Sequence, residues 1–186
     1  MEDRVNQILD FWFKEALPEE WFRKKDSFDN RIKKKFFDDY NKATNNEYDD
    51  WQDKPHSCLA LVILLDQFSR NLFRNHKKAF SQDQKCRLIV NESIDKGDLN
   101  ELNVNEKLFH LLPLLHSEEI SDHIYVHKLC DLHLKNHSQI KLIKNSWNNH
   151  TDVIKRFKRY PHRNEILNRK STMQEINFLK DSNSTW

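Results

Sequence analysis

The sequence predicts an all-α protein, a single domain of about eight to ten helices that spans residues 1–186. Apolar residues recur at helical spacing along nearly the whole chain, and no segment shows the alternation typical of a strand. The chain has one Gly and four Pro among its 186 residues, too little glycine for many tight hairpins. A length of 186 residues is that of one ordinary domain and is enough to bury a core.

The N-terminal half is predicted to hold two amphipathic helices followed by a buried one. The apolar positions of the two amphipathic helices are Val5, Ile8, Leu9, Trp12 and Phe13, and then Phe28, Ile32, Phe36 and Tyr40. Pro18 separates them, and a short helical turn is expected at 48–51. The next helix, 58–73, follows Pro55 and is apolar on all sides in its first half. Such a helix is expected at the centre of the fold.

Capping signals mark the helices of the C-terminal half. The segment 81–84 has the pattern of a capping box, and its helix is expected to end at Gly97, the chain's one glycine. Asn103 with Glu106 is expected to cap the following helix, and Thr172 with Glu175 the last one. The remaining helices are expected over 120–134 and 140–157.

Composition and charge exclude several classes of protein. The formal net charge is only +2, so overall charge indicates neither a nucleic-acid nor a membrane partner. No apolar run reaches the roughly 20 residues needed to span a bilayer, and no signal peptide is visible. The glycine content also argues against a glycine-rich phosphate loop. We therefore expect a cytoplasmic protein without a cofactor.

The cysteines and paired histidines do not predict a metal site. Cys58, Cys86 and Cys130 have no zinc or redox spacing, and buried free thiols in a reducing cytosol fit them best. Histidines at i,i+4 occur twice, at 123/127 and 133/137. Both pairs lack the glutamate of a metalloprotease helix and fall in an exposed-looking pattern, and zinc generally needs three or four ligands.

The densest polar chemistry lies at the end of the central helix. On a helical wheel Asp66, Arg70 and Arg74 share one face, with Gln67 and Asn71 beside it. This face could be exposed to solvent, in which case the Asp66–Arg70 pair would stabilise the helix only slightly. The turn before it is apolar on the same side, however, so we expect the polar face to be partly covered. A covered charge needs a partner or a ligand.

A basic segment follows the predicted helix 140–157. Residues 155–170 contain seven Lys or Arg and one acidic residue, Glu165. Cations near a helix C-terminus favour its dipole, which accounts for Arg159. That explanation does not extend to His162, Arg163 and Asn164, which follow Pro161 and open a new turn. An anion site or a nucleic-acid site is the alternative.

A third group of polar residues lies between two predicted helices, at His116 and Glu118. Ser117 there needs no function beyond capping the helix 120–134, with acidic residues in its first turn. Capping does not account for His116. A histidine close to a carboxylate can act as a general base, although most histidines near helix ends are structural or exposed.

Together these motifs resemble a family of bacterial proteins of unknown function, DUF924. The resemblance rests on Ile8–Phe13, Trp21-Phe22, Leu64–Arg74, 115–118, 157–167 and 171–175, in this order from about residue 5 to residue 180. It implies a helical array of tetratricopeptide-like superhelical packing and no particular activity. Ser69 stands where the family usually has Pro, which predicts a straighter helix, and Tyr160 where it often has Phe.

The leading functional hypothesis is a polar pocket that binds a small phosphate- or carboxylate-bearing ligand, as an enzyme or as a binder. Arg70 or Arg163 would hold the anion, His116 or His162 would exchange protons, and Asp66 would orient one of them. The other expected members are Gln67, Asn71, Arg74, Glu118, Arg159 and Asn164. The hypothesis requires the three segments to lie within about 15 Å, the span of one pocket.

Two alternatives remain open at this stage. A tetratricopeptide-like interaction module would bind a peptide or protein on a concave face, with the polar cluster serving only to hold helices together. Nucleic-acid binding through 155–170 is the weaker alternative, because the net charge is almost zero.

Overall fold

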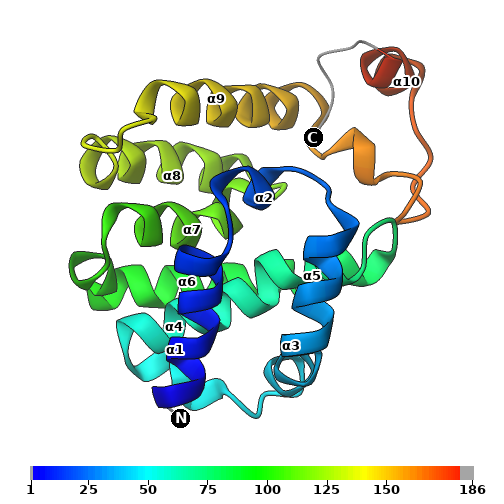
Figure 1. The fold of residues 1–186 in the computed structure, drawn as a ribbon. Coiled ribbons are helices and arrows are strands. Elements are labelled where there is room, and N and C mark those ends of the chain that lie inside the picture. The colour runs from blue at the N-terminus through cyan, green and yellow to red at the C-terminus, as the bar shows by residue number, and fades with distance from the viewer. Residues whose placement is uncertain (1, 181–186) are drawn as a thin grey trace.

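The computed structural model describes residues 2–180, and these residues form helices and connecting turns without a strand (Figure 1). The all-α class is therefore confirmed. The predicted domain, 1–186, also includes residues 1 and 181–186, which lie outside the described range. The α-helices are α1 (Glu2–Asp10), α2 (Pro18–Phe22), α3 (Asp26–Thr44), α4 (Pro55–Val62), α5 (Ser69–Leu72), α6 (Asp83–Lys96), α7 (Val104–Leu115), α8 (Ile120–His133), α9 (Ile140–Phe157) and α10 (Met173–Lys180). Two π-helical segments, η1 (Phe11–Glu15) and η3 (Ile63–Phe68), and four 3-10 turns, η2 (Asp49–Asp53), η4 (Lys77–Phe80), η5 (Asp98–Glu101) and η6 (Pro161–Arg163), complete them.

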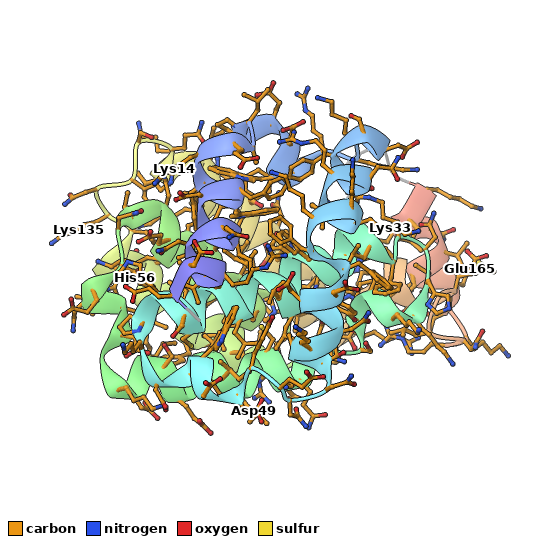
Figure 2. The ribbon with its side chains drawn as sticks, turned by 60° about the horizontal axis from the view of Figure 1, so that its bottom comes forward. Lys14, Lys33, Asp49, His56, Lys135 and Glu165 are labelled. Carbon is orange, nitrogen blue, oxygen red and sulfur yellow. The ribbon has the colours of Figure 1, made fainter. Side chains whose placement is uncertain are left out.

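The helices α6, α7, α8 and α9 stack in chain order, each in contact with the next (Figure 1). Helices α1 and α3 cross this stack, and α1 contacts α4 while α3 contacts η3 and α5. The turn η6 and the helix α10 lie beyond the end of α9. Charged side chains such as Lys14, Lys33 and Lys135 project outward from the ribbon (Figure 2). No helix of the described part is long and apolar enough to cross a membrane.

The central helix is buried along most of its length, as its sequence predicts, and its last residues, 70–73, are partly exposed. Every side chain from Ser57 to Ser69 is at most 7 % exposed. Aromatic rings from the N-terminal helices cover one side of it, with the Phe36 ring 5.2 Å from that of Phe68. The three cysteines are buried and free, as expected. Asp66 and Gln67 are carried into the interior because they belong to this buried segment.

The central helix is not the regular, straight helix expected from Ser69. Its middle is the π-helical segment η3, and α5 resumes only at Ser69. The Ser69 hydroxyl lies 2.6 Å from the carbonyl oxygen of Leu65 and 2.9 Å from that of Asp66. A hydroxyl that bonds a carbonyl one turn back is a common source of helix distortion. The wide turn includes Asp66, and π-helical turns are frequent at functional sites.

Three of the five predicted caps are confirmed and two are wrong. Ser117 does not cap α8: the N-cap residue is Glu119, and the Ser117 hydroxyl accepts from the backbone N–H of Glu119. Gly97 ends α6 in the left-handed conformation, Asn103 and Glu106 form a capping box, and the Thr172 hydroxyl accepts from the Glu175 backbone N–H. No side chain caps α6 from 81–82. The carboxylate of Asp83, which belongs to the predicted box, instead binds two arginines.

Replacing the C-cap glycine should test the end of α6. Gly97→Ala is expected to lower the free energy of unfolding by about 1–2 kcal/mol, the cost of a left-handed non-glycine residue. Gly97 has φ +87°, and a Cβ there would meet only the Asn100 side chain at 3.6 Å, so the cost is conformational and not steric. Urea denaturation measures it. Lys158→Gly, at φ +59° after α9, should have the opposite sign; equal signs for the two variants would contradict this explanation.

Candidate functional site

The centre of the site is a contact between Asp66 and His116. Asp66 comes from η3 and is completely buried, and His116 follows the last residue of α7. The imidazole Nδ1 lies 2.8 Å from the Asp66 carboxylate. Two of the three predicted segments therefore meet, although 50 residues separate them in the sequence.

The contact fixes the protonation of the imidazole ring. The pKa of Asp66 is about 2: burial alone would raise it, but the charges of Arg70 and His116 and hydrogen bonds from His116 and Gln67 more than offset burial. An ionised carboxylate only accepts hydrogen bonds, so Nδ1 of His116 carries the proton. The opposite nitrogen, Nε2, has no hydrogen-bond partner among residues 2–180, and the side chain is 17 % exposed. In this tautomer Nε2 is the ring nitrogen without a proton, and it can accept one.

Two arginines share a second carboxylate next to this pair. Arg70 contacts Asp66 at 3.1 Å and donates to both oxygens of Asp83, at 3.0 and 3.2 Å. Arg163, from η6, donates to the same carboxylate at 3.1 Å and to the backbone oxygen of His116 at 3.0 Å. The third predicted segment thus joins the other two through direct hydrogen bonds. The requirement that all three meet within one pocket's span is met.

Arg163 is held in an unusual environment for a cation. Its side chain is 7 % exposed, and its guanidinium lies over the rings of Phe80 and Tyr160, at 4.7 and 4.5 Å. Burial lowers the pKa of Arg163, although Asp83 acts in the opposite direction. Its Nε–H is buried and has no hydrogen-bond partner in the described structure. A buried guanidinium with an unused donor lowers the stability of the fold, which makes it a candidate for ligand binding.

The structure distinguishes between the two histidines predicted to exchange protons. Burial, assisted by the positive charge of Arg163, lowers the pKa of His162 to about 3. His162 is therefore neutral near pH 7 and a poor proton acceptor there. His116 has a carboxylate on one nitrogen and an available second nitrogen, so it is the better candidate for a general base.

Glu118, Asn164 and Arg159 belong to neighbouring networks. Glu118 binds Arg169 at 2.7 Å and accepts from the backbone N–H of Tyr160 at 2.8 Å. Asn164 accepts from Arg169 at 3.0 Å. Arg159 forms two hydrogen bonds with the buried Glu175 of α10, at 2.6 and 2.8 Å. These contacts hold η6 and α10 in place, and none of them reaches the His116 ring.

Asn71 and Arg74 point away from the cluster. Both bind Asp29 of α3, the amide of Asn71 at 2.8 Å and Arg74 through Nε and a terminal nitrogen. The helical wheel placed Arg74 with Arg70, but α5 ends at Leu72, so the wheel no longer applies to Arg74. The wide turn of η3 likewise shifts the residues after it relative to the residues before it.

The prediction that the histidine pairs 123/127 and 133/137 are exposed was wrong for one member of each, since His137 is buried and so is His123. His123 is completely buried and lies 3.1 Å from the hydroxyl of Thr151 and 2.9 Å from the carbonyl oxygen of Ser117. His127 approaches the same hydroxyl at 2.8 Å. The pair joins α8 to α9 and has no third ligand; residues 2–180 contain no group of acidic, His and Cys side chains suited to a metal.

Sequence reasoning missed Asp83, the residue that links the two arginines. The only signal was its place in an expected capping box, where an acidic residue needs no other explanation. Phe80 was also missed, and Tyr160 was noted only as a family position. Nothing in the local sequence indicates that the Phe80 ring would lie against Arg163, because that contact joins residues 83 positions apart.

Comparison with known proteins identifies relatives without an assigned activity. A family model described as "Bacterial protein of unknown function (DUF924)" matches residues 8–183. A solved structure of a protein of unknown function from Agrobacterium tumefaciens is similar, with a TM-score of 0.85 and 33 % sequence identity over 96 % of this chain and 98 % of that one. A search of curated proteins found no match.

Proposed function

Because the chain belongs to the bacterial DUF924 family of unknown function, we propose a function from the site itself: the protein binds a small carboxylate- or phosphate-bearing ligand, and His116 serves as a general base toward it. Tetratricopeptide-like packing with peptide binding is a separate proposal. Its support is that α6 to α9 stack in chain order. The polar cluster favours the small ligand.

The observation that carries the proposal is the 2.8 Å contact between Asp66 and His116. A buried carboxylate that orients an imidazole and fixes its tautomer prepares the opposite nitrogen to accept a proton. His123, which joins α8 to α9, uses both of its nitrogens. His116 uses only one within the described residues.

The arginines support an anionic ligand. The hydrogen bond from Arg163 to the His116 carbonyl places a guanidinium beside the imidazole. Guanidinium groups bind carboxylates and phosphates through paired, directed hydrogen bonds, and Asp83 shows that a carboxylate fits between Arg70 and Arg163.

The basic segment gives less support to nucleic-acid binding than its sequence suggested. Arg159, Arg163 and Arg169 are each paired with a carboxylate: Glu175, Asp83 and Glu118 respectively. Neutralising several phosphates of a nucleic acid would break those pairs, whereas a single small anion can use the Nε–H of Arg163, which is free in the described part of the chain.

Titration with acetate and inorganic phosphate, followed through the NMR signals of the histidine rings, tests the proposal. We expect at least one of the two probes to shift the His116 signal, and Arg163→Met to weaken that binding at least tenfold, since it removes the donors of the anion site. His116→Asn, whose amide nitrogen can replace Nδ1 toward Asp66, should keep the fold and alter binding.

Arg156→Met is the matched control. It removes the same charge from the same segment, but Arg156 lies over the rings of Phe157 and Phe178, away from His116. Equal weakening by the two arginine variants would indicate nonspecific attraction. If neither probe moves the His116 signal at millimolar concentration, the cluster is an internal network and the proposed function is wrong.

A further inference from the structure

The charges of the site restrict which anion it can accept. Resting on the proposed function, we infer that the ligand carries a single negative charge and that His116 takes up one proton when the ligand binds. The inference concerns the ligand class and the linkage between ligand and proton, neither of which follows from the proposed function alone.

The cluster is already electrically neutral. Within residues 2–180, the carboxylates of Asp66 and Asp83 face the guanidinium groups of Arg70 and Arg163. The side chains of these four residues are at most 20 % exposed. Glu118 and Arg169 form a neighbouring pair that is neutral as well. An anion that enters therefore adds a negative charge that no unpaired cation of the cluster compensates.

An uncompensated charge in such a place is costly. Water screens buried charges poorly, and an unpaired buried ion costs several kcal/mol. The arginines cannot supply the missing charge, because both already share Asp83. A proton gained by a neighbouring group is then the available compensation.

Of the titratable groups around the site, His116 is best placed to take that proton. Burial lowers the pKa of each neighbouring histidine: His123 on α8, His150 on α9 and His162 on η6. Burial also raises the pKa of the Tyr160 hydroxyl and of the Cys86 thiol, so both are already protonated near neutral pH. Asp83 and Arg70 remain paired with each other.

Protonated His116 can serve both negative groups at once. Nδ1–H continues to donate to Asp66, and the new Nε2–H can donate to the anion. Asp66 stabilises the imidazolium through the 2.8 Å contact. One imidazole takes one proton, so one proton balances one negative charge. A dianion such as sulfate would leave a second charge uncompensated.

Acetate and sulfate are the probes for this inference, because acetate is a monoanion and sulfate a dianion throughout pH 6–8. We expect acetate to bind more tightly than sulfate. Its affinity should rise as the pH falls, by up to about tenfold per pH unit, because each acetate that binds brings one proton with it. Calorimetry in two buffers of different ionisation enthalpy should give close to one proton taken up per acetate bound.

Variants separate His116 from the rest of the protein. His116→Asn should weaken acetate binding, because no proton then compensates the anion, and the affinity that remains should not depend on pH. His56→Asn, an exposed histidine on α4, should behave like the parent chain. A thermal unfolding curve for each variant establishes that it is folded.

The possible failures are distinguishable. Acetate binding without proton uptake, or tighter binding of sulfate, overturns the inference and leaves the proposed function intact. Unchanged pH dependence in His116→Asn overturns it too, since the proton would then go elsewhere. If neither probe binds the parent chain, the proposed function itself falls, and the inference with it.

Discussion

Asp66→Ala should lower the free energy of unfolding by about 3–5 kcal/mol, the range expected when one partner of a buried ion pair is removed. Asp66 is fully buried and accepts from His116 and Gln67 while facing Arg70. Alanine leaves His116 and Gln67 without their acceptor, removes one of the two carboxylates that pair with Arg70, and also leaves a small cavity. Urea denaturation at pH 7 measures the loss.

Asp66→Asn separates charge from shape. The amide oxygen can still accept from His116, and Arg70 retains Asp83, so we expect roughly half the loss of the alanine variant. Asp152→Asn is the matched control, because the ion pair of Asp152 with Lys155 is largely exposed and should leave the urea midpoint unchanged. Similar losses for Asp66→Ala and Asp152→Asn would show that the buried cluster contributes nothing special to stability.

The location of this cluster could be predicted because burial is visible in the sequence. An uninterrupted apolar run preceded Asp66, so the charges at its end had to be covered, and covered charges need partners. The i,i+4 spacing of Asp66 and Arg70 then predicted their contact. The family resemblance then indicated that the polar motifs around His116 and Arg163 would be its partners from distant parts of the chain.

The partners of individual side chains could not be predicted in the same way. Arg74 and Asn71 belong to Asp29 because the helix widens at η3 and ends at Leu72, and neither event has a clear local signal. Asp83 resembled an ordinary helix-start residue. Its role depends on where Arg70 and Arg163 meet, which is a property of the tertiary structure.

The protein should lose stability on mild acidification, and His110 should be a measurable part of the loss. Burial lowers the pKa of His110 to about 4, against about 6.5 in an unfolded chain. Between these values the unfolded state binds more protons than the folded state, so stability falls as the pH falls below about 6.5. For His110 the loss between pH 7.5 and 5.5 is about 1 kcal/mol. Burial lowers the pKa values of His150 and His162 too, so they act in the same direction.

His110→Gln isolates this contribution. The Nε2 of His110 lies 2.9 Å from the hydroxyl of Ser93, which donates to Asp98 at 2.8 Å. The ring therefore donates to Ser93, and a glutamine amide can replace that donor without binding a proton. Packing changes make the variant less stable at both pH values. The informative quantity is therefore the difference in the free energy of unfolding between pH 7.5 and 5.5. That difference should be about 1 kcal/mol smaller than in the parent chain.

The range from pH 7.5 to 5.5 reports on histidines and not on the buried carboxylates. The pKa values of Asp66 and Glu175 are both about 2, so their protonation contributes only at more acidic pH. His56→Gln changes an exposed histidine and should leave the pH dependence of the parent chain intact. An unchanged pH dependence in His110→Gln would mean that His110 is protonated in the folded protein. The contact from Asp98 through Ser93 would then have to rearrange, because the imidazolium would carry a proton on the buried Nδ1, which has no acceptor in the described structure.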